Sequence, residues 1–169
     1  MTLLASGLSD LVGAELAQLD DPRVTNHVRH LLVAPRPVMR GWDYGSEGEA
    51  FPCWSVLEHT ESNTGIAYCE SGFGPKSPWG LVTLAGTEHM SMGMDDGWFP
   101  RFLDAYFDSY AATELSIWRV FQDRDAEFPG RPISAEGTWK SAWAEVERLR
   151  ALHPEIRYHC GQSLYTSDA

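Results

Sequence analysis

Residues 89–110, HMSMGMDDGWFPRFLDAYFDSY, decide how the rest of the chain is organised. In the first half, methionines alternate with small or polar residues, which is the period of a strand with one apolar face. The sequence Asp95-Asp96-Gly97 is typical of a tight turn. The apolar positions of the second half have helical spacing and are Phe99, Phe102, Leu103, Tyr106, Phe107 and Tyr110. The segment therefore predicts a strand, a turn, and a helix that packs aromatic side chains on a sheet.

Apolar segments at 38–42, 53–59, 64–70 and 79–85 precede the methionine strand, and each predicts a further strand. The segments 53–59 and 64–70 flank Glu61-Ser62-Asn63, whose composition is typical of a hairpin turn. Because the connections are short, we expect an antiparallel meander of about five strands over 38–95 rather than a parallel sheet, which needs crossover helices.

Helical patterns are found on both sides of the predicted sheet. An N-terminal helix pair is expected from 9–19 and from a second helix that Asp21 caps, with Pro22 at its first position and Pro35 and Pro37 after it. A helix is predicted near 99–112 and another near 138–153, both packed on the sheet. The segment 115–122 alternates like a strand but could also continue the preceding helix. Together these patterns predict a single α+β domain over 1–169.

The chain is strongly acidic, with 24 Asp and Glu against 13 Lys and Arg and a net charge of -11. Nucleic-acid binding and anionic membrane surfaces need clustered basic residues, so the charge argues against both. It is compatible with steering towards a basic partner, although solubility alone also explains it. An odd count of three cysteines, no signal peptide pattern and no long apolar run make the cytoplasm the expected compartment.

Metal and nucleophile motifs are missing from the sequence. The six histidines and three cysteines include no CxxC, HExxH or HxH spacing, so no metal or cofactor is expected. There is no GxSxG motif. Cys53 and Cys69 lie inside apolar strands, where we expect buried thiols that behave as small apolar groups and resist ionisation. No catalytic residue is predicted from these patterns.

Carboxylates and histidines leave an alternative open. If Glu58 and Glu70 of the hairpin shared a cleft with His59 or His89, the chain could be a small hydrolase or a ligand-binding domain. No spacing rule identifies these residues as a catalytic set, and solvated or ion-paired strand residues are the simpler explanation.

Aromatic residues recur in or beside Gly- and Pro-containing loops, among acidic residues. Such a mixture is typical of a protein interface, although the rings could also cover the ends of the sheet. The predicted partner-binding residues are Asp43, Tyr44, Glu47, Glu49, Phe73, Trp79, Asp95, Asp96 and Trp98. The leading hypothesis is a non-enzymatic module that docks a basic protein partner, in concrete form an immunity or inhibitor protein of a toxin enzyme. A third hypothesis assigns the aromatic residues to the interface of a homo-oligomer or larger assembly.

Overall fold

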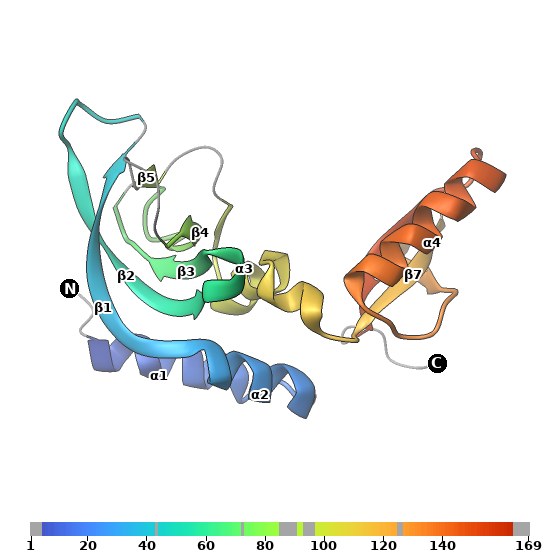
Figure 1. Cartoon of the computed structure of the whole chain (residues 1–169), viewed down its shortest axis with the longest axis horizontal. Coiled ribbons are helices and arrows are strands. Elements are labelled where there is room, and N and C mark those ends of the chain that lie inside the picture. Colours follow the sequence, from blue (N-terminus) through green and yellow to red (C-terminus); the bar gives the residue numbers. More distant parts are fainter. Residues whose placement is uncertain are drawn as a thin grey trace. The chain divides into compact units, whose positions relative to one another are not determined.

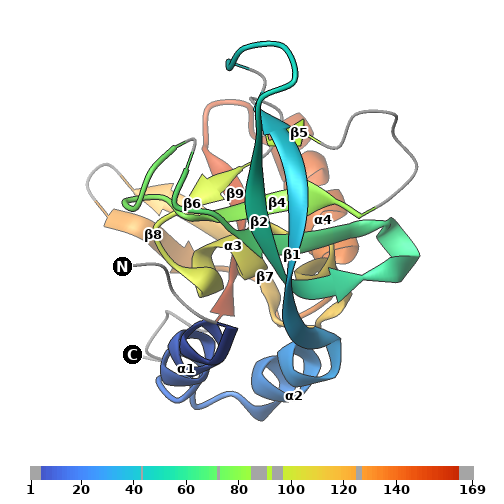
Figure 2. The ribbon, with the colours of Figure 1, turned by 90° about the vertical axis from the view of Figure 1, so that its left-hand side faces the viewer.

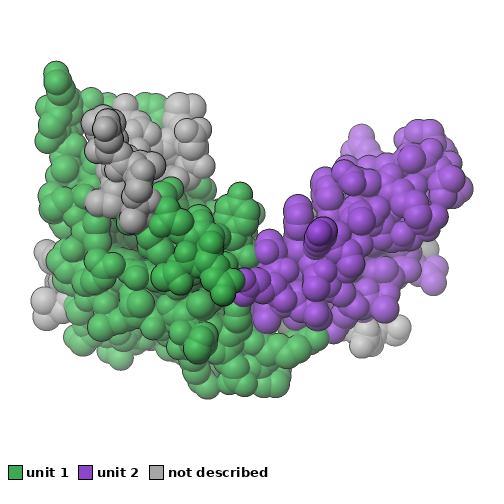
Figure 3. Space-filling view, viewed as in Figure 1, with its two compact units in different colours: residues 1–112 green, residues 113–169 purple. Residues whose placement is uncertain are grey.

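A computed structural model describes residues 5–42, 44–71, 73–84, 91–92, 97–124 and 127–163. The chain divides into two compact units, Met1–Ala112 and Thr113–Ala169, which are coloured separately in Figure 3. Each unit has its own sheet, and the predicted α+β class is confirmed. That the whole of 1–169 folds as one domain stays a prediction.

The first unit contains a six-stranded sheet and helices beside it (Figure 1). Its elements in chain order are α1 (Ala5–Leu16), α2 (Pro22–Leu31), β1 (Leu32–Trp42), β2 (Ala50–His59), the 3-10 helix η1 (Thr60–Ser62), β3 (Thr64–Tyr68), β4 (Trp79–Thr83), β5 (Ser91–Met92), β6 (Trp98–Phe99) and α3 (Phe102–Asp108). A second 3-10 helix, η2 (Ala111–Glu114), contains the boundary between the units.

The strand order is β5-β1-β2-β3-β4-β6. Strands β1 to β4 pair antiparallel with their chain neighbours, which confirms the predicted meander for these four strands. The short strand β5 does not extend the meander beside β4. It pairs parallel with the end of β1, and β6 occupies the edge of β4 instead. The other residues of the predicted methionine strand lie outside the described part of the chain.

The β2–β3 hairpin has the predicted position, and its turn depends on Asn63. This residue adopts a left-handed backbone with φ 56°, a conformation that asparagine tolerates better than most residues. Its N–H donates to the carbonyl of Thr60 over 3.1 Å. From this turn the antiparallel pairing begins at His59 and Thr64, shifts by one residue between Leu57 and Ser55, and continues to Trp54 and Tyr68.

Strand β1 begins earlier than the sequence predicts. Pro35 and Pro37 do not separate a helix from a strand at 38–42, because both lie inside β1. The described part of β5 pairs with β1 at Gly41 and Trp42, away from the prolines. A proline lacks the N–H of a ladder hydrogen bond and is tolerated where a strand has an edge. Figure 2 shows β1 and β2 as a long ribbon that ends at the 44–49 loop.

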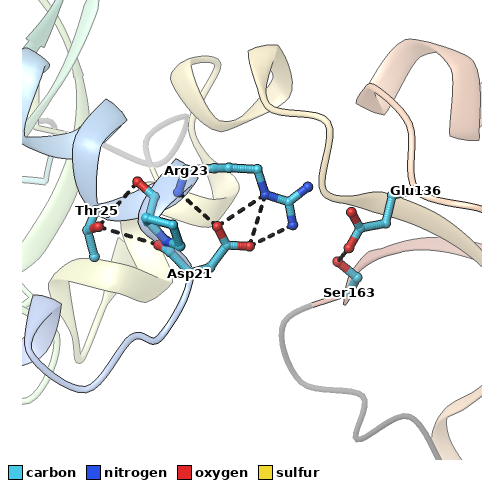
Figure 4. A network of polar contacts seen from close by, with 6 residues as sticks. Asp21, Arg23, Thr25, Glu136 and Ser163 are labelled. Carbon is cyan, nitrogen blue, oxygen red and sulfur yellow. Dashed lines mark hydrogen bonds and ion pairs between the residues drawn. The ribbon is translucent and has the colours of Figure 1, made fainter.

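Polar side chains cap the helices of the first unit. The Asp21 carboxylate accepts the N–H of Arg23 over 2.8 Å, as expected for the N-cap of α2, and also binds the Arg23 guanidinium (Figure 4). This contact with Arg23 lowers the pKa of Asp21. The Glu15 carboxylate of α1 accepts the N–H groups of Phe102 and Leu103 over 3.1 and 3.0 Å, and so caps α3. Helix α3 therefore begins at Phe102 rather than near 99.

The second unit has a three-stranded sheet in the order β8-β7-β9. Its elements are β7 (Trp118–Arg124), β8 (Glu127–Pro132), α4 (Trp139–Leu152) and β9 (Tyr158–Gln162). The segment 115–122 therefore contributes to a strand. Helix α4, which Thr138 caps, packs on β7 and β9, so its sheet is the second one and not the meander. No helix in the described ranges has both the length and the apolar character needed to cross a membrane.

We expect opposite stability changes from two glycine-to-alanine substitutions in the first unit. A Cβ at Gly80 would lie 2.6 Å from the Trp98 ring, so Gly80→Ala should destabilise the fold by about 1–3 kcal/mol. Nothing lies within 4 Å of a Cβ at Gly13 in α1, so Gly13→Ala should stabilise by about 0.5–1 kcal/mol. Urea unfolding measures the free energy of unfolding of both variants. Equal changes in the two variants would contradict the contact between Gly80 and the Trp98 ring.

Candidate functional site

Four aromatic side chains, Trp42, Tyr44, Phe73 and Trp98, form a connected group that we call the aromatic cluster. The Trp42 ring centroid lies 5.2 Å from that of Tyr44 and 5.0 Å from that of Phe73. The Phe73 ring stacks on Trp98 at 5.7 Å. These residues come from the end of β1, the loop after β3 and strand β6, so the sheet brings together segments that are distant in sequence.

The inner and outer rings of the cluster have different surroundings. Trp42 and Trp98 are half-buried and pack on the core residues Cys53, Ala67, Cys69 and Val82. Tyr44 and Phe73 are 55% and 43% exposed. The two tryptophans therefore anchor the cluster, and the two outer rings form an apolar surface. Aromatic side chains have few rotatable bonds, so they lose little conformational entropy on binding a partner.

An acidic loop, residues 44–49, adjoins the aromatic cluster. Glu47 and Glu49 are both exposed. The Glu49 carboxylate accepts the N–H of Ser46 over 2.9 Å, which holds the loop in a closed turn. Gly45 lies against both Glu49 and the Trp42 ring, where a Cβ would meet Trp42 Cδ1 at 2.9 Å. The carboxylate is therefore positioned next to the aromatic cluster.

The structure separates the predicted partner-binding residues into groups. Tyr44, Glu47, Glu49 and Phe73 are exposed, and Trp98 is half-buried in the cluster. Asp43, Asp95 and Asp96 lie outside the described residues. Trp42, at the end of β1, joins Tyr44 to Phe73 but was not in the predicted set; its place directly before Asp43-Tyr44 was the available signal.

The prediction that Trp79 lies on the partner-binding surface is wrong. Its side chain is 3% exposed. The ring packs edge-on against two other rings. The centroid distances are 4.9 Å to Tyr68 and 5.3 Å to Phe102. Trp79 belongs to β4, an inner strand between β3 and β6, and α3 packs on this strand. The residue is therefore part of the core.

The residues of the predicted carboxylate cleft are held in separate contacts. Glu58 forms an ion pair with Arg36 at 2.6 Å and accepts the Ser55 hydroxyl over 2.9 Å. His59 Nδ1 lies 2.6 Å from the hydroxyl oxygen of Ser62 in the hairpin turn. These contacts give Glu58 and His59 structural roles within the hairpin.

The hairpin register also keeps Glu58 and Glu70 apart. Glu58 pairs with Gly65 beside the turn, whereas Glu70 lies beyond the last residue of β3 at the other end. The five residue steps from Gly65 to Glu70 correspond to about 16 Å of strand. Glu70 accepts the Tyr68 hydroxyl over 2.9 Å. The two carboxylates therefore do not share a cleft, and His89 lies outside the described residues.

The expectation for the strand cysteines is wrong for Cys69. Cys53 and Cys69 are buried, as predicted. However, a hydrogen bond from the Cys53 thiol, with further ones from Ser71, lowers the pKa of Cys69 to about 7. Burial without such donors has the opposite effect at Cys160, whose pKa it raises to about 11. The hydrogen bonds therefore outweigh burial at Cys69.

The second unit contains an oriented imidazole. His159 Nδ1 lies 2.6 Å from the Asp123 carboxylate, and the His159 ring stacks on Phe121 with centroids 5.3 Å apart. At the end of the same sheet, the Ser163 hydroxyl donates to Glu136 (Figure 4). A carboxylate that orients a histidine is compatible with either structural or acid–base roles.

Comparisons of this chain with protein-family models, with curated proteins and with solved structures find no match. The assignment of a function therefore depends on the contacts described above.

We predict that Tyr68 makes the fold less stable at high pH. Burial, together with the bond to Glu70, raises its pKa from 10.0 to about 12. The unfolded state loses this proton first, so the free energy of unfolding should fall as the pH rises from 10.0 towards 12. Urea unfolding across this range should show a shallower fall for Tyr68→Phe. If the free energy of unfolding fell equally steeply with pH in wild type and Tyr68→Phe, Tyr68 would not be the group responsible.

Proposed function

We propose that this protein is a non-enzymatic binding module that docks a basic protein partner through the aromatic cluster and the acidic loop. The observation that carries the proposal is the continuous contact from Tyr44 through Trp42 and Phe73 to Trp98, with exposed rings at Tyr44 and Phe73. Exposed apolar groups on a supported base are typical of interface anchors.

Charge supports a basic partner rather than an acidic one. The net charge of -11 attracts cations over distances of about 10 Å at moderate salt, which raises association rates. Glu47 and Glu49 place negative charge beside the rings. Asp43 directly precedes Tyr44, Asp95 and Asp96 precede Gly97-Trp98 in the sequence, and all three contribute to the net charge. The partner would associate by charge and be retained by ring burial.

The concrete form of the proposal is an immunity or inhibitor protein that acts in the cytoplasm on a toxin enzyme. An enzyme that acts on an anionic substrate carries a basic active site, which an acidic aromatic surface can cover. Such an inhibitor needs no catalytic residue of its own.

Truncation of the two exposed rings tests the aromatic half of the proposal. Proteins would be captured from the native cell with three forms of the chain. These are the wild type, the Tyr44→Ala/Phe73→Ala variant and a Leu11→Ala control. Leu11 is an exposed apolar residue on α1, outside the cluster. We expect one basic protein to be captured by wild type and control, and its purified form to bind the double variant at least about tenfold more weakly.

Neutralisation of the loop tests the charge half. The Glu47→Gln/Glu49→Gln variant should associate with the same purified partner more slowly at low salt, and the difference should shrink at high salt. Surface plasmon resonance measures the association rate, which depends on charge, separately from the dissociation rate, which depends on ring burial. An acidic partner or unchanged binding by the ring variant would contradict the proposal. Capture of the chain by itself alone would support the homo-oligomer hypothesis instead.

A further inference from the structure

Cys53 is in β2, and Cys69 directly follows the last residue of β3. The pairs Ser55–Ala67 and Trp54–Tyr68 run in antiparallel register, so the next pair outward is Cys53–Cys69. The N–H of Cys69 donates to the carbonyl of Pro78 over 2.8 Å, which continues the ladder between β3 and β4 by one residue beyond Tyr68. Directly opposite residues share a face and have Cα atoms about 4.5–5.5 Å apart, a spacing that a disulfide can bridge.

The two sulfur atoms interact in the reduced protein. The Cys53 thiol hydrogen-bonds to Cys69, and both the N–H and the hydroxyl of Ser71 bond to the same Cys69 sulfur. These three donors favour the Cys69 thiolate and account for its pKa of about 7. One sulfur of the pair is therefore an activated nucleophile, and the other is a thiol within reach of it.

The surroundings of the pair restrict what can reach it. Cys53 and Cys69 are 0% and 2% exposed and form a small apolar group with Ala67 and Val82. Ser71, which is partly exposed, contacts the Cys69 sulfur from the loop after β3. A small uncharged reagent suits this position better than a bulky or charged one.

We propose that Cys53 and Cys69 form a redox-active dithiol, which a hydroperoxide converts into a reversible intramolecular disulfide. In this assignment Cys69 is the attacking thiolate and Cys53 is the resolving thiol. The inference is independent of the proposed binding function. The two thiols are adjacent through the register of the hairpin rather than through a short sequence motif, because 15 residues separate them in the chain.

The reaction balances with one peroxide molecule. The Cys69 thiolate attacks a peroxide oxygen, an S–O bond forms, and the O–O bond breaks to release hydroxide, which takes a proton from solvent. The Cys53 sulfur then attacks the sulfenic acid of Cys69, so that an S–S bond forms and the S–O bond breaks. The leaving hydroxide departs as water with the Cys53 proton. Two thiols are oxidised, hydrogen peroxide is reduced, and two waters form.

Peptide mapping of the oxidised full-length protein tests this proposal. Trypsin places both Cys53 and Cys69 in the peptide 41–76 and Cys160 in the peptide 158–169. After equimolar hydrogen peroxide, denaturation and alkylation, peptide 41–76 should be lighter by two hydrogen atoms and unalkylated. Peptide 158–169 should be alkylated as before. Dithiothreitol should restore two alkylation sites to peptide 41–76.

Trapping with dimedone tests the two roles. In Cys53→Ala the sulfenic acid has no resolving partner, so dimedone should label Cys69 at least several-fold more than in wild type. Cys69→Ala should give no label at either position, and Cys160→Ala should form the disulfide as wild type does. Circular dichroism shows whether each variant is folded. If a variant fails to fold, the wild-type peptide map still decides the proposal.

Three results would overturn the inference. The first is a wild-type peptide 41–76 that remains fully alkylated after peroxide treatment of the folded protein. The second is a disulfide that includes Cys160 or links two chains. The third is irreversible oxidation of Cys69 with no disulfide. Each would show that Cys53 does not resolve an oxidised Cys69.

Discussion

The register of the β2–β3 hairpin is the constraint on which the rest of the first unit depends. It is set at the turn, where Asn63 takes a left-handed backbone, and it shifts by one residue at an irregularity between Ser55 and Leu57. Because side chains alternate between faces, a slip of one residue would move every side chain of a strand to the other face. The shifted register beyond Ser55 brings Cys53 and Cys69 together, and the length of the hairpin holds Glu58 and Glu70 at opposite ends. The turn and the register shift together create the potential Cys53–Cys69 site, and the same hairpin excludes a site shared by Glu58 and Glu70.

Local features of the fold could be predicted from the sequence, whereas pairings between distant segments could not. The hairpin turn and the N-caps at Asp21 and Thr138 depend on a few neighbouring residues, and the structure has all three. The position of β5 beside β1 and the separate sheet under α4 depend on which strand edge each segment meets. Periodicity reports the faces of a strand but not its neighbours. The sequence analysis therefore did not predict the second sheet, β8-β7-β9.

The candidate site shows the same division. Composition placed Tyr44 and Phe73 in loops, and both are exposed. Trp79 has similar Gly and Pro neighbours, yet its strand lies between two others, so burial was decided by the sheet order. The acidity of Cys69 could not be foreseen, because it depends on donors supplied by Cys53 across the hairpin and by the Ser71 loop. Sequence patterns give the polarity of a side chain, but its partners come from tertiary structure.

The contact between Gly80 and Trp98 has an evolutionary consequence. The two residues are direct cross-strand partners in β4 and β6, and the indole covers the space that a Cβ would fill. Gly97 lies two residues before Phe99 in the same segment, and a Cβ there would lie 2.7 Å from the Phe99 ring. Neither member of such a pair can change freely by itself. Among descendants of a common ancestor, size at position 80 should vary inversely with size at position 98, and the same compensation should link 97 with 99.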